Sequence, residues 1–193
     1  MEEGFKVSAI LLAAGLSTRM GLDKLLLPFQ GLTLLEHTIG VISAFPFYQR
    51  ILVTTQARLS VINLDKKIKA IVNSNPELGQ SGSIRLGVMN ATGDAYMFFM
   101  ADQPLLDHAA IEALLRYADG EHIVYPIFNE VPCTPAIFPA KFREELLSVQ
   151  GDQGGRQIRQ SHPDACLPIE LRSGAPLLLD VDTWEDYCAV MKN

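Results

Sequence analysis

A glycine-rich segment near the N-terminus carries the residue types that most clearly could do chemistry. An apolar run over residues 7–12 breaks into small residues and then Gly15, which is typical of a buried strand that leads into a tight loop. Gly15 and Gly21 would let backbone N–H groups approach an anion closely, and Arg19 and Lys24 would add positive charge. The segment therefore predicts a phosphate-binding loop whose natural ligand is a triphosphate.

Two aspartates are candidate metal ligands. Asp102 follows the apolar run at residues 96–100, where an uncompensated carboxylate would be costly, so we expect a cation partner. Magnesium fits this expectation, because it usually takes one or two carboxylates plus substrate phosphates; the alternative is that Asp102 caps the following turn. Near the C-terminus, Thr183 and Asp186 have the spacing of a capping box, which leaves Asp182 as the candidate second ligand.

Two further glycine-rich segments could contact substrates. Gln80, Gly82 and Ser83 lie in a loop before a predicted helix, where their polar groups and small size would suit a base or sugar. The alternative is that a serine of this loop caps the helix. Arg156 ends the segment at residues 151–156 and could bind an anionic second substrate, or could be a solvated side chain of a turn.

Composition limits the class of protein. The chain has 193 residues, of which 48% are hydrophobic, enough for one α/β domain over residues 1–193. It has no apolar run near eighteen residues and no basic N-terminal region, so we expect a cytoplasmic protein with no membrane partner. A net charge of −6 argues against a nucleic-acid partner. Three distant cysteines without a C-x-x-C spacing disfavour disulfides and zinc.

Alternating strand and helix patterns must position these residues. They predict a Rossmann-like α/β fold with a mainly parallel sheet and helices on both faces. The predicted strands cover residues 6–12, 50–54, 68–72, 95–100 and 123–126, and the predicted helices cover 33–44, 83–90 and 109–118. The glycine loop and Asp102 both follow strands, as ligand-binding groups do in such sheets.

The later part of the chain has a weaker pattern. It predicts a strand at residues 134–138, helices at 141–149 and 153–160, and a strand that ends before Asp180. We interpret the region after residue 126 as a flap that faces the substrate, with Pro135 and the apolar residues after it offering a flat surface.

The glycine loop resembles the signature L-A-A-G-x-S-x-R-M-G-x-D-K of the MobA-like nucleotidyltransferases of the molybdenum-cofactor type. The matching residues are Leu12, Ala13, Ala14, Gly15, Ser17, Arg19, Met20, Gly21, Asp23 and Lys24. The closing D-x-D-T-x-E-D, with Trp184 in place of proline, and the G-D-x-G-x-R segment at residues 151–156 are similar to the same family. The resemblance extends from Leu12 to Asp186, although Cys133 stands where relatives have glycine.

The resemblance implies a fold like that of nucleotide-diphospho-sugar transferases and is strongest to the family's cytidylyltransferases. It implies Mg²⁺-dependent transfer of CMP from CTP to the phosphate of molybdopterin, the organic part of the molybdenum cofactor, for a xanthine-dehydrogenase-type enzyme, with release of pyrophosphate. The implied site has catalytic Lys24, Arg19 and Asp102; metal ligands Asp102 and Asp182; nucleotide-binding Leu12, Ala13, Ala14, Gly15, Gln80, Gly82 and Ser83; and acceptor-binding Arg156, Asp152 and Pro135.

Two alternatives stay open. The same chemistry could act on a sugar phosphate, a polyol phosphate or another pterin, and possession of the motif does not fix the base of the nucleotide. A non-catalytic protein that delivers a cofactor to a molybdenum enzyme is the second alternative. Arg19, Lys24 and Asp102 argue against it, because a binding module has no evident need for all three.

Overall fold

A mixed β-sheet forms the centre of the computed structural model, which describes residues 4–17, 20–151, 154–171 and 179–192. The eight strands follow the order β10-β7-β9-β6-β1-β4-β5, with β8 paired to β7 alone. Their bounds are β1 Val7–Ala13, β4 Gln49–Thr54, β5 Lys69–Val72, β6 Ala95–Met100, β7 Ile123–Phe128, β8 Val131–Pro132, β9 Ala136–Pro139 and β10 Cys166–Glu170.

Strand β1 is the middle of the parallel part of the sheet. It pairs with β4 on one side and β6 on the other, both parallel, and all seven of its residues are buried. Such an apolar strand, covered on both faces, is what its sequence predicts. The carboxyl ends of β1, β4 and β6 consequently meet at one edge of the sheet.

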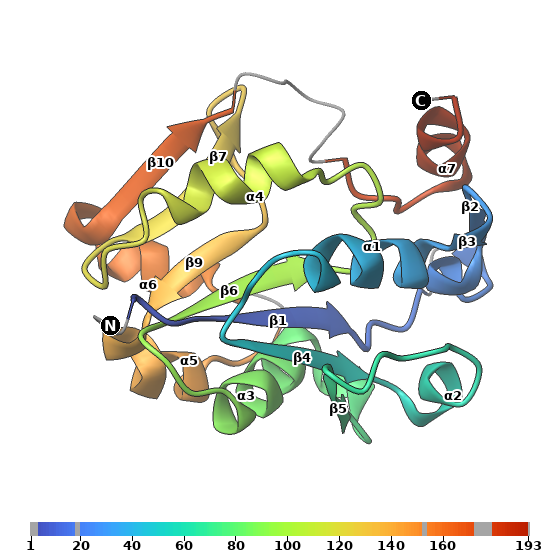
Figure 1. The fold of residues 1–193 in the computed structure, drawn as a ribbon, viewed down its shortest axis with the longest axis horizontal. Helices are drawn as coiled ribbons and strands as arrows, with labels where there is room; N and C mark the ends of the chain where they lie inside the picture. The colour runs from blue at the N-terminus through green and yellow to red at the C-terminus, as the bar shows by residue number, and fades with distance from the viewer. Residues whose placement is uncertain (1–3, 18–19, 152–153, 172–178, 193) are drawn as a thin grey trace.

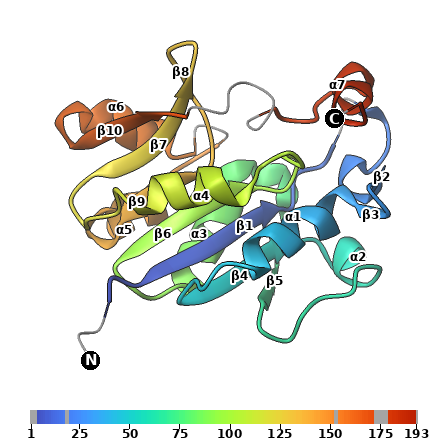
Figure 2. The same ribbon diagram turned by 45° about the horizontal axis from the view of Figure 1, so that its top comes forward.

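Helices cover both faces of the sheet (Figures 1 and 2). On one face, α1 (Leu34–Ser43) and α4 (His108–Leu115) share an apolar cluster with alternate residues of β1, including Leu11. On the other face, α3 (Gln80–Asn90), α5 (Arg143–Ser148) and α6 (Arg156–Ser161) share a second cluster with the intervening residues, including Ile10. The domain is therefore a three-layer α/β structure, and the predicted fold class is confirmed.

Small elements extend beyond the carboxyl ends of β1 and β6 (Figure 1). They are the β2–β3 hairpin (Pro28–Phe29 and Leu32–Thr33), α2 (Gln56–Leu59) and α7 (Trp184–Val190). A separate apolar cluster of Phe29, Leu34, Val181 and Val190 holds α7 against the hairpin. This cluster brings the C-terminal segment, including Asp180 and Asp182, to the edge where β1 and β6 end.

The prediction of a flap after residue 126 is wrong for the segment that contains β9. Instead of covering the substrate, β9 lies inside the sheet, antiparallel to both β6 and β7, and all four of its residues are buried. Pro135 is buried beside it, and Phe138 packs in the core with 2% exposure. The strand predicted before Asp180 is also wrong at Leu179, its only residue within the described ranges, because Leu179 is not in a strand. No helix in the described ranges is long and apolar enough to cross a membrane.

Candidate active site

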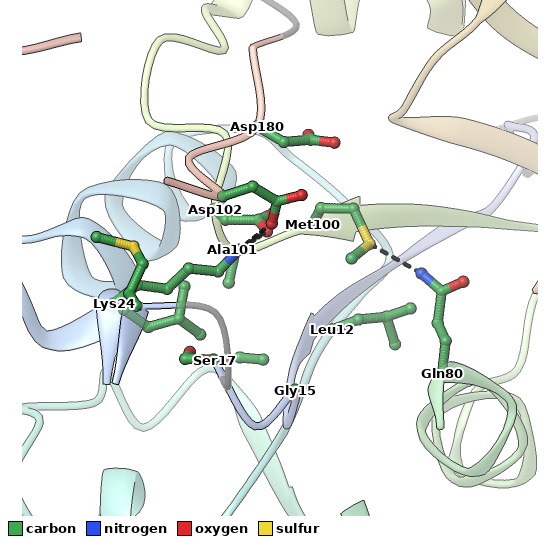
Figure 3. Close-up of a pocket in the computed structure, with 13 residues that line it drawn as sticks. Leu12, Gly15, Ser17, Lys24, Gln80, Met100, Ala101, Asp102 and Asp180 are labelled. Atoms are coloured by element: carbon green, nitrogen blue, oxygen red, sulfur yellow. Dashed lines mark hydrogen bonds and ion pairs between the residues drawn. The ribbon is translucent and has the colours of Figure 1, made fainter. Parts of the chain in front are cut away.

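Lys24 joins two aspartates at the edge where the parallel strands end. Its Nζ donates to Asp102 Oδ2 at 2.7 Å (Figure 3) and to Asp182 Oδ1 at 2.8 Å. The lysine begins a short 3₁₀ helix, Lys24–Leu26, which Asp23 caps by accepting a hydrogen bond from the backbone N–H of Leu25. Asp102 follows β6 and Asp182 precedes α7, so three distant parts of the sequence meet here as predicted.

The electrostatics of this group favour charged forms. Burial lowers the pKa of Lys24, but the charge of Asp102 and the hydrogen bonds to Asp102 and Asp182 outweigh burial, so the pKa lies above its usual value. The side chains of Lys24 and Asp102 are only 12% and 14% exposed. In such a partly buried place an ammonium and a carboxylate each need a partner, and each has one.

One oxygen of Asp102 remains without a protein partner. Among the described residues, nothing donates a hydrogen bond to its buried Oδ1. A buried carboxylate oxygen without a donor is costly unless a ligand satisfies it, and a divalent cation is a suitable ligand for a hard oxygen. The residues present therefore fit a magnesium-type cation held between Asp102 and substrate phosphates.

Asp180 is a third carboxylate of the site that the sequence reasoning missed. Desolvation of its carboxyl group and the nearby charge of Asp102 raise its pKa to about 6. A hydrogen bond that the Gln103 amide donates at 2.8 Å lowers the pKa and offsets part of this rise. Its position two residues before Asp182 was a usable signal, because the D-x-D pattern places both carboxylates on the same short segment.

These residues line a cavity of about 520 Å³, drawn in Figure 3. Its described lining comprises Leu12, Ala13, Gly15, Ser17, Met20, Lys24, Leu25, Gln80, Met100, Ala101, Asp102, Asp180 and Asp182. At neutral pH the three aspartates outnumber the single lysine among these residues. A triphosphate could enter such a cavity only with cations to offset the repulsion.

A second cavity, of about 300 Å³, opens beside the first. It shares Leu12, Gly15, Gln80 and Met100 with the first cavity and extends to Ala14, Leu16, Pro76, Glu77, Gly79 and Ser83. Two continuous compartments, one with several charged side chains and one with mixed polar and apolar walls, suit the triphosphate and the base of a nucleotide, respectively.

The loop before α3 forms one wall of the second cavity. Helix α3 begins at Gln80 after Gly79, and no side chain caps it, so neither Ser81 nor Ser83 has the capping role considered as an alternative. The Gln80 amide donates to Met100 Sδ at 3.2 Å, and Ser83 accepts a hydrogen bond from Asn73 at 3.1 Å. Gly82 is buried behind these side chains and lines neither cavity.

Arg58 supports the glycine loop from behind, and sequence reasoning missed it. This side chain is 3% exposed; it donates to the carbonyl oxygens of Ala13 at 2.6 Å and Gly15 at 2.7 Å, and to Asp23 Oδ2 at 2.7 Å. A single guanidinium thus links the end of β1, the loop and the cap of the Lys24 helix. Its partners are distant in sequence, so no local pattern could have revealed it.

The remaining predicted residues lie elsewhere. Arg19 and Asp152 fall outside the described residues. Pro135 is buried next to β9. Arg156 lines a third cavity, of about 610 Å³, between β7, β8, β10 and α6, and not the cavity of Lys24. The structure therefore brings the predicted lysine, the predicted metal ligands and the predicted nucleotide-binding residues other than Gly82 to two adjoining cavities, and leaves Arg156 apart from them.

Comparison with known proteins agrees with this architecture. The profile of the MobA-like NTP transferase domain matches residues 9–166. A 2-C-methyl-D-erythritol 4-phosphate cytidylyltransferase of Haemophilus influenzae is 28% identical, with 90% of this chain and 86% of the relative aligned. A probable molybdenum cofactor guanylyltransferase of Bacillus cereus is 23% identical over 97% of each chain.

Solved structures show the same fold. The crystal structure of Rv0371c from Mycobacterium tuberculosis H37Rv superposes with a TM-score of 0.86 at 24% identity, covering 98% of this chain and 99% of that one. A manganese complex of the same protein gives a TM-score of 0.83. At this level of identity the likeness concerns the fold.

Proposed function

The chain belongs to the MobA-like NTP transferase domain family, and on that premise we propose that it transfers a nucleotidyl group from a nucleoside triphosphate to the phosphate of a small acceptor. The observation that carries this proposal is Lys24, held at 2.7 and 2.8 Å from two aspartates where β1 and β6 end. A cavity with this combination suits a polyphosphate that arrives with a cation.

In the proposed reaction, an oxygen of the acceptor phosphate forms a bond to the α-phosphorus. The bond from that phosphorus to the bridging oxygen breaks, and pyrophosphate leaves with the electron pair. Such a transfer needs no protein nucleophile, because positioning and neutralisation of charge supply most of the catalysis. Lys24 and Arg19 would stabilise the charge on the phosphates, and the backbone of the glycine loop would hold them.

Mg²⁺ is the proposed cofactor, with Asp102 and Asp182 as its ligands. When bound, the ion would neutralise negative charge on the triphosphate and on the leaving pyrophosphate. Lys24 now neutralises the two carboxylates that the ion would use. We expect its ammonium group to turn toward the phosphates when the nucleotide binds, because the ion then supplies the positive charge that the aspartates need.

CTP is the proposed nucleotide. The residues Leu12 to Gly15 together with Gln80, Gly82 and Ser83 resemble the cytidine version of the two loops, and a relative at 28% identity is named a cytidylyltransferase. Another relative is named a guanylyltransferase, so GTP is the competitor to test. We expect CTP to bind more tightly; calorimetry that finds GTP tenfold tighter, a difference of about 1.4 kcal/mol, would exclude the cytidine assignment.

The molybdenum cofactor is the proposed acceptor, with Arg156, Asp152 and Pro135 as candidate contacts and a xanthine-dehydrogenase-type enzyme as the recipient. The name of the Bacillus cereus relative supports this acceptor. The name of the Haemophilus influenzae relative favours a second candidate, a polyol phosphate. Both candidates present a phosphate to the nucleotide, so the chemistry at Lys24 would be the same.

The decisive experiment supplies the purified protein and Mg²⁺ with each of the four triphosphates and either molybdenum-loaded molybdopterin or 2-C-methyl-D-erythritol 4-phosphate. Mass spectrometry would identify the product, and a coupled assay would measure pyrophosphate. We expect the cytosine dinucleotide of molybdopterin. If product forms only with the polyol phosphate, the second candidate acceptor is correct. If no combination of triphosphate and acceptor gives product, a non-catalytic delivery protein is favoured.

A further inference from the structure

The cavity that contains Arg156 has the opposite charge from the cavity of Lys24. Its volume is about 610 Å³, and its lining contains two arginines and no carboxylate among the described residues. On a chain of net charge −6, a cavity lined in this way is a local positive site. Its other walls are mainly apolar and include Val131, Pro132 and Pro163.

Arg159 is the unusual residue of this cavity. It is half-buried, and its guanidinium lies 4.9 Å from the centre of the Tyr125 ring. In the described part of the chain, neither Arg159 nor Arg156 forms an ion pair with a carboxylate. Burial, with a contribution from the charge of Arg156, lowers the pKa of Arg159.

Two neighbouring guanidinium groups, one of them half-buried and without a counter-ion, repel each other and lose hydration. An aromatic face offsets only part of that cost. A planar anion such as a carboxylate, or a phosphate, would offset the rest by accepting paired hydrogen bonds from the guanidinium forks. The arrangement is therefore suited to an anionic ligand.

The cavity adjoins the nucleotide compartments at two places. Gly154, two residues before Arg156, lies against the Gln80 side chain, which lines both of those compartments. The Cys133 thiol lies near enough to both Asp180 and Arg159 for their charges to act on its pKa, which burial raises. A molecule in the Arg159 cavity can thus extend toward the site of transfer.

We infer that this cavity binds the end of the acceptor remote from the reacting phosphate, a heteroaromatic ring beside a second anionic group, with Arg156 and Arg159 on that second anion and the apolar wall against the ring. The inference rests on the proposed function, because a transferase needs a second substrate beside the nucleotide. It replaces the buried residues after Pro135 as the apolar surface for the acceptor and adds Arg159 and Tyr125 to the residues that would select it.

Fluorescence anisotropy with 6-carboxypterin tests the inference, because this probe joins a flat ring to a carboxylate and reports its own binding. Arg159→Met and Arg156→Met should each weaken its binding about tenfold or more. Arg159→Lys keeps the charge without the planar fork and should weaken it less. Arg116→Met is the matched control, because Arg116 lies in an exposed ion pair on α4. Unfolding temperatures would show that the variants fold.

Two expected results would show that the probe binds in the Arg159 cavity and not in the nucleotide cavity. Saturating CTP with Mg²⁺ should leave the probe bound, and the parent pterin, which lacks the carboxylate, should bind more weakly than the probe. The inference is overturned if Arg159→Met binds 6-carboxypterin like the wild type, if CTP with Mg²⁺ displaces the probe, or if the probe does not bind. A failure of the proposed function is a separate result, because pyrophosphate release with every triphosphate and acceptor pair would then be absent whatever the probe does.

Discussion

Lys24 bridges Asp102 and Asp182, two carboxylates that would otherwise repel each other in a partly buried cavity. Its side chain and that of Asp102 lie where the charge of a triphosphate would change during transfer. Contacts of this kind affect the transition state more than the ground state. Substitution of either residue is therefore the most direct test of the site.

Lys24→Met and Asp102→Asn should each lower kcat by roughly two to three orders of magnitude, as the loss of an electrostatic stabiliser does. Steady-state pyrophosphate release would measure the effect, with nucleotide affinity measured separately. Lys141→Met is the control, because this lysine forms an exposed ion pair with Glu121 away from the cavity. Near-normal turnover in either variant would remove that residue from the site.

The carboxyl group of Asp180 makes the stability of the folded protein depend on pH. Folding raises its pKa from an ordinary 3.8 to about 6, so the folded protein binds this proton more tightly than the unfolded chain does. The stabilisation is therefore complete below about pH 4 and is lost as the pH rises through 6. Asp180→Asn cannot titrate, so its stability relative to the wild type should rise between pH 4 and pH 7.

Urea unfolding at several pH values, without added metal, would measure this difference. Asp164→Asn, in an exposed turn outside the cavity, is the matched control. A wild type and an Asp180→Asn variant whose stabilities stay parallel from pH 4 to pH 7 would show that the carboxyl group is not perturbed by the cavity.

At the scale of elements, Arg58 ties β1, the glycine loop and the Lys24 helix together. Arg58→Met would leave the Gly15 carbonyl and Asp23 without this donor and would remove one of two side-chain donors to the Ala13 carbonyl, at a cost of about 1 to 3 kcal/mol. Chemical denaturation would measure the loss. The exposed Arg116→Met should change stability by less than about 0.5 kcal/mol, and an equally small change in Arg58→Met would contradict the proposed support.

Helix α3 approaches β1 closely because residue 87 is glycine. A Cβ there would lie 2.5 Å from Ile10 Cγ2, so Gly87→Ala should overpack the interface and destabilise the protein by about 1 to 3 kcal/mol. Gly40 in α1 is exposed, and no atom lies within 4 Å of the place that an alanine methyl group would take there. Gly40→Ala should therefore stabilise the protein by up to about 1 kcal/mol. Thermal unfolding should show a lower melting temperature for Gly87→Ala and a higher one for Gly40→Ala than for the wild type.

Sequence patterns predicted the central parallel strands well because β1, β4 and β6 are short, largely buried apolar runs. They missed β10, where Pro168 interrupts the run; proline is tolerated there because β10 is an edge strand. They also predicted β9 as a strand but not its place in the sheet, since no local pattern states which strands will be its neighbours. Within the site, Lys24, Asp102 and Asp182 came from motifs, whereas Arg58 depends on long-range contacts.

The charge of the whole molecule would oppose binding of the proposed triphosphate ligand. A chain of net charge −6, with an aspartate-rich cavity, repels a free triphosphate unless a divalent cation accompanies it. Removal of metal with EDTA should weaken CTP binding about tenfold or more, and Mg²⁺ should restore it. Calorimetry with and without EDTA would measure the change; equal affinity in both conditions would show that the cavity needs no cation for binding.

Strand β9 would also affect the length of an acceptor bound as proposed. Neighbouring strands lie about 4.8 Å apart, so inserting β9 between β6 and β7 separates those two strands by about 10 Å. Asp102 follows β6, and Tyr125 lies on β7 beside Arg159. Under the proposal for the Arg159 cavity, this separation would add to the distance along the strands between the two ends of the acceptor, so an acceptor that spans both ends would bind more tightly than a shorter phosphate that fills only one.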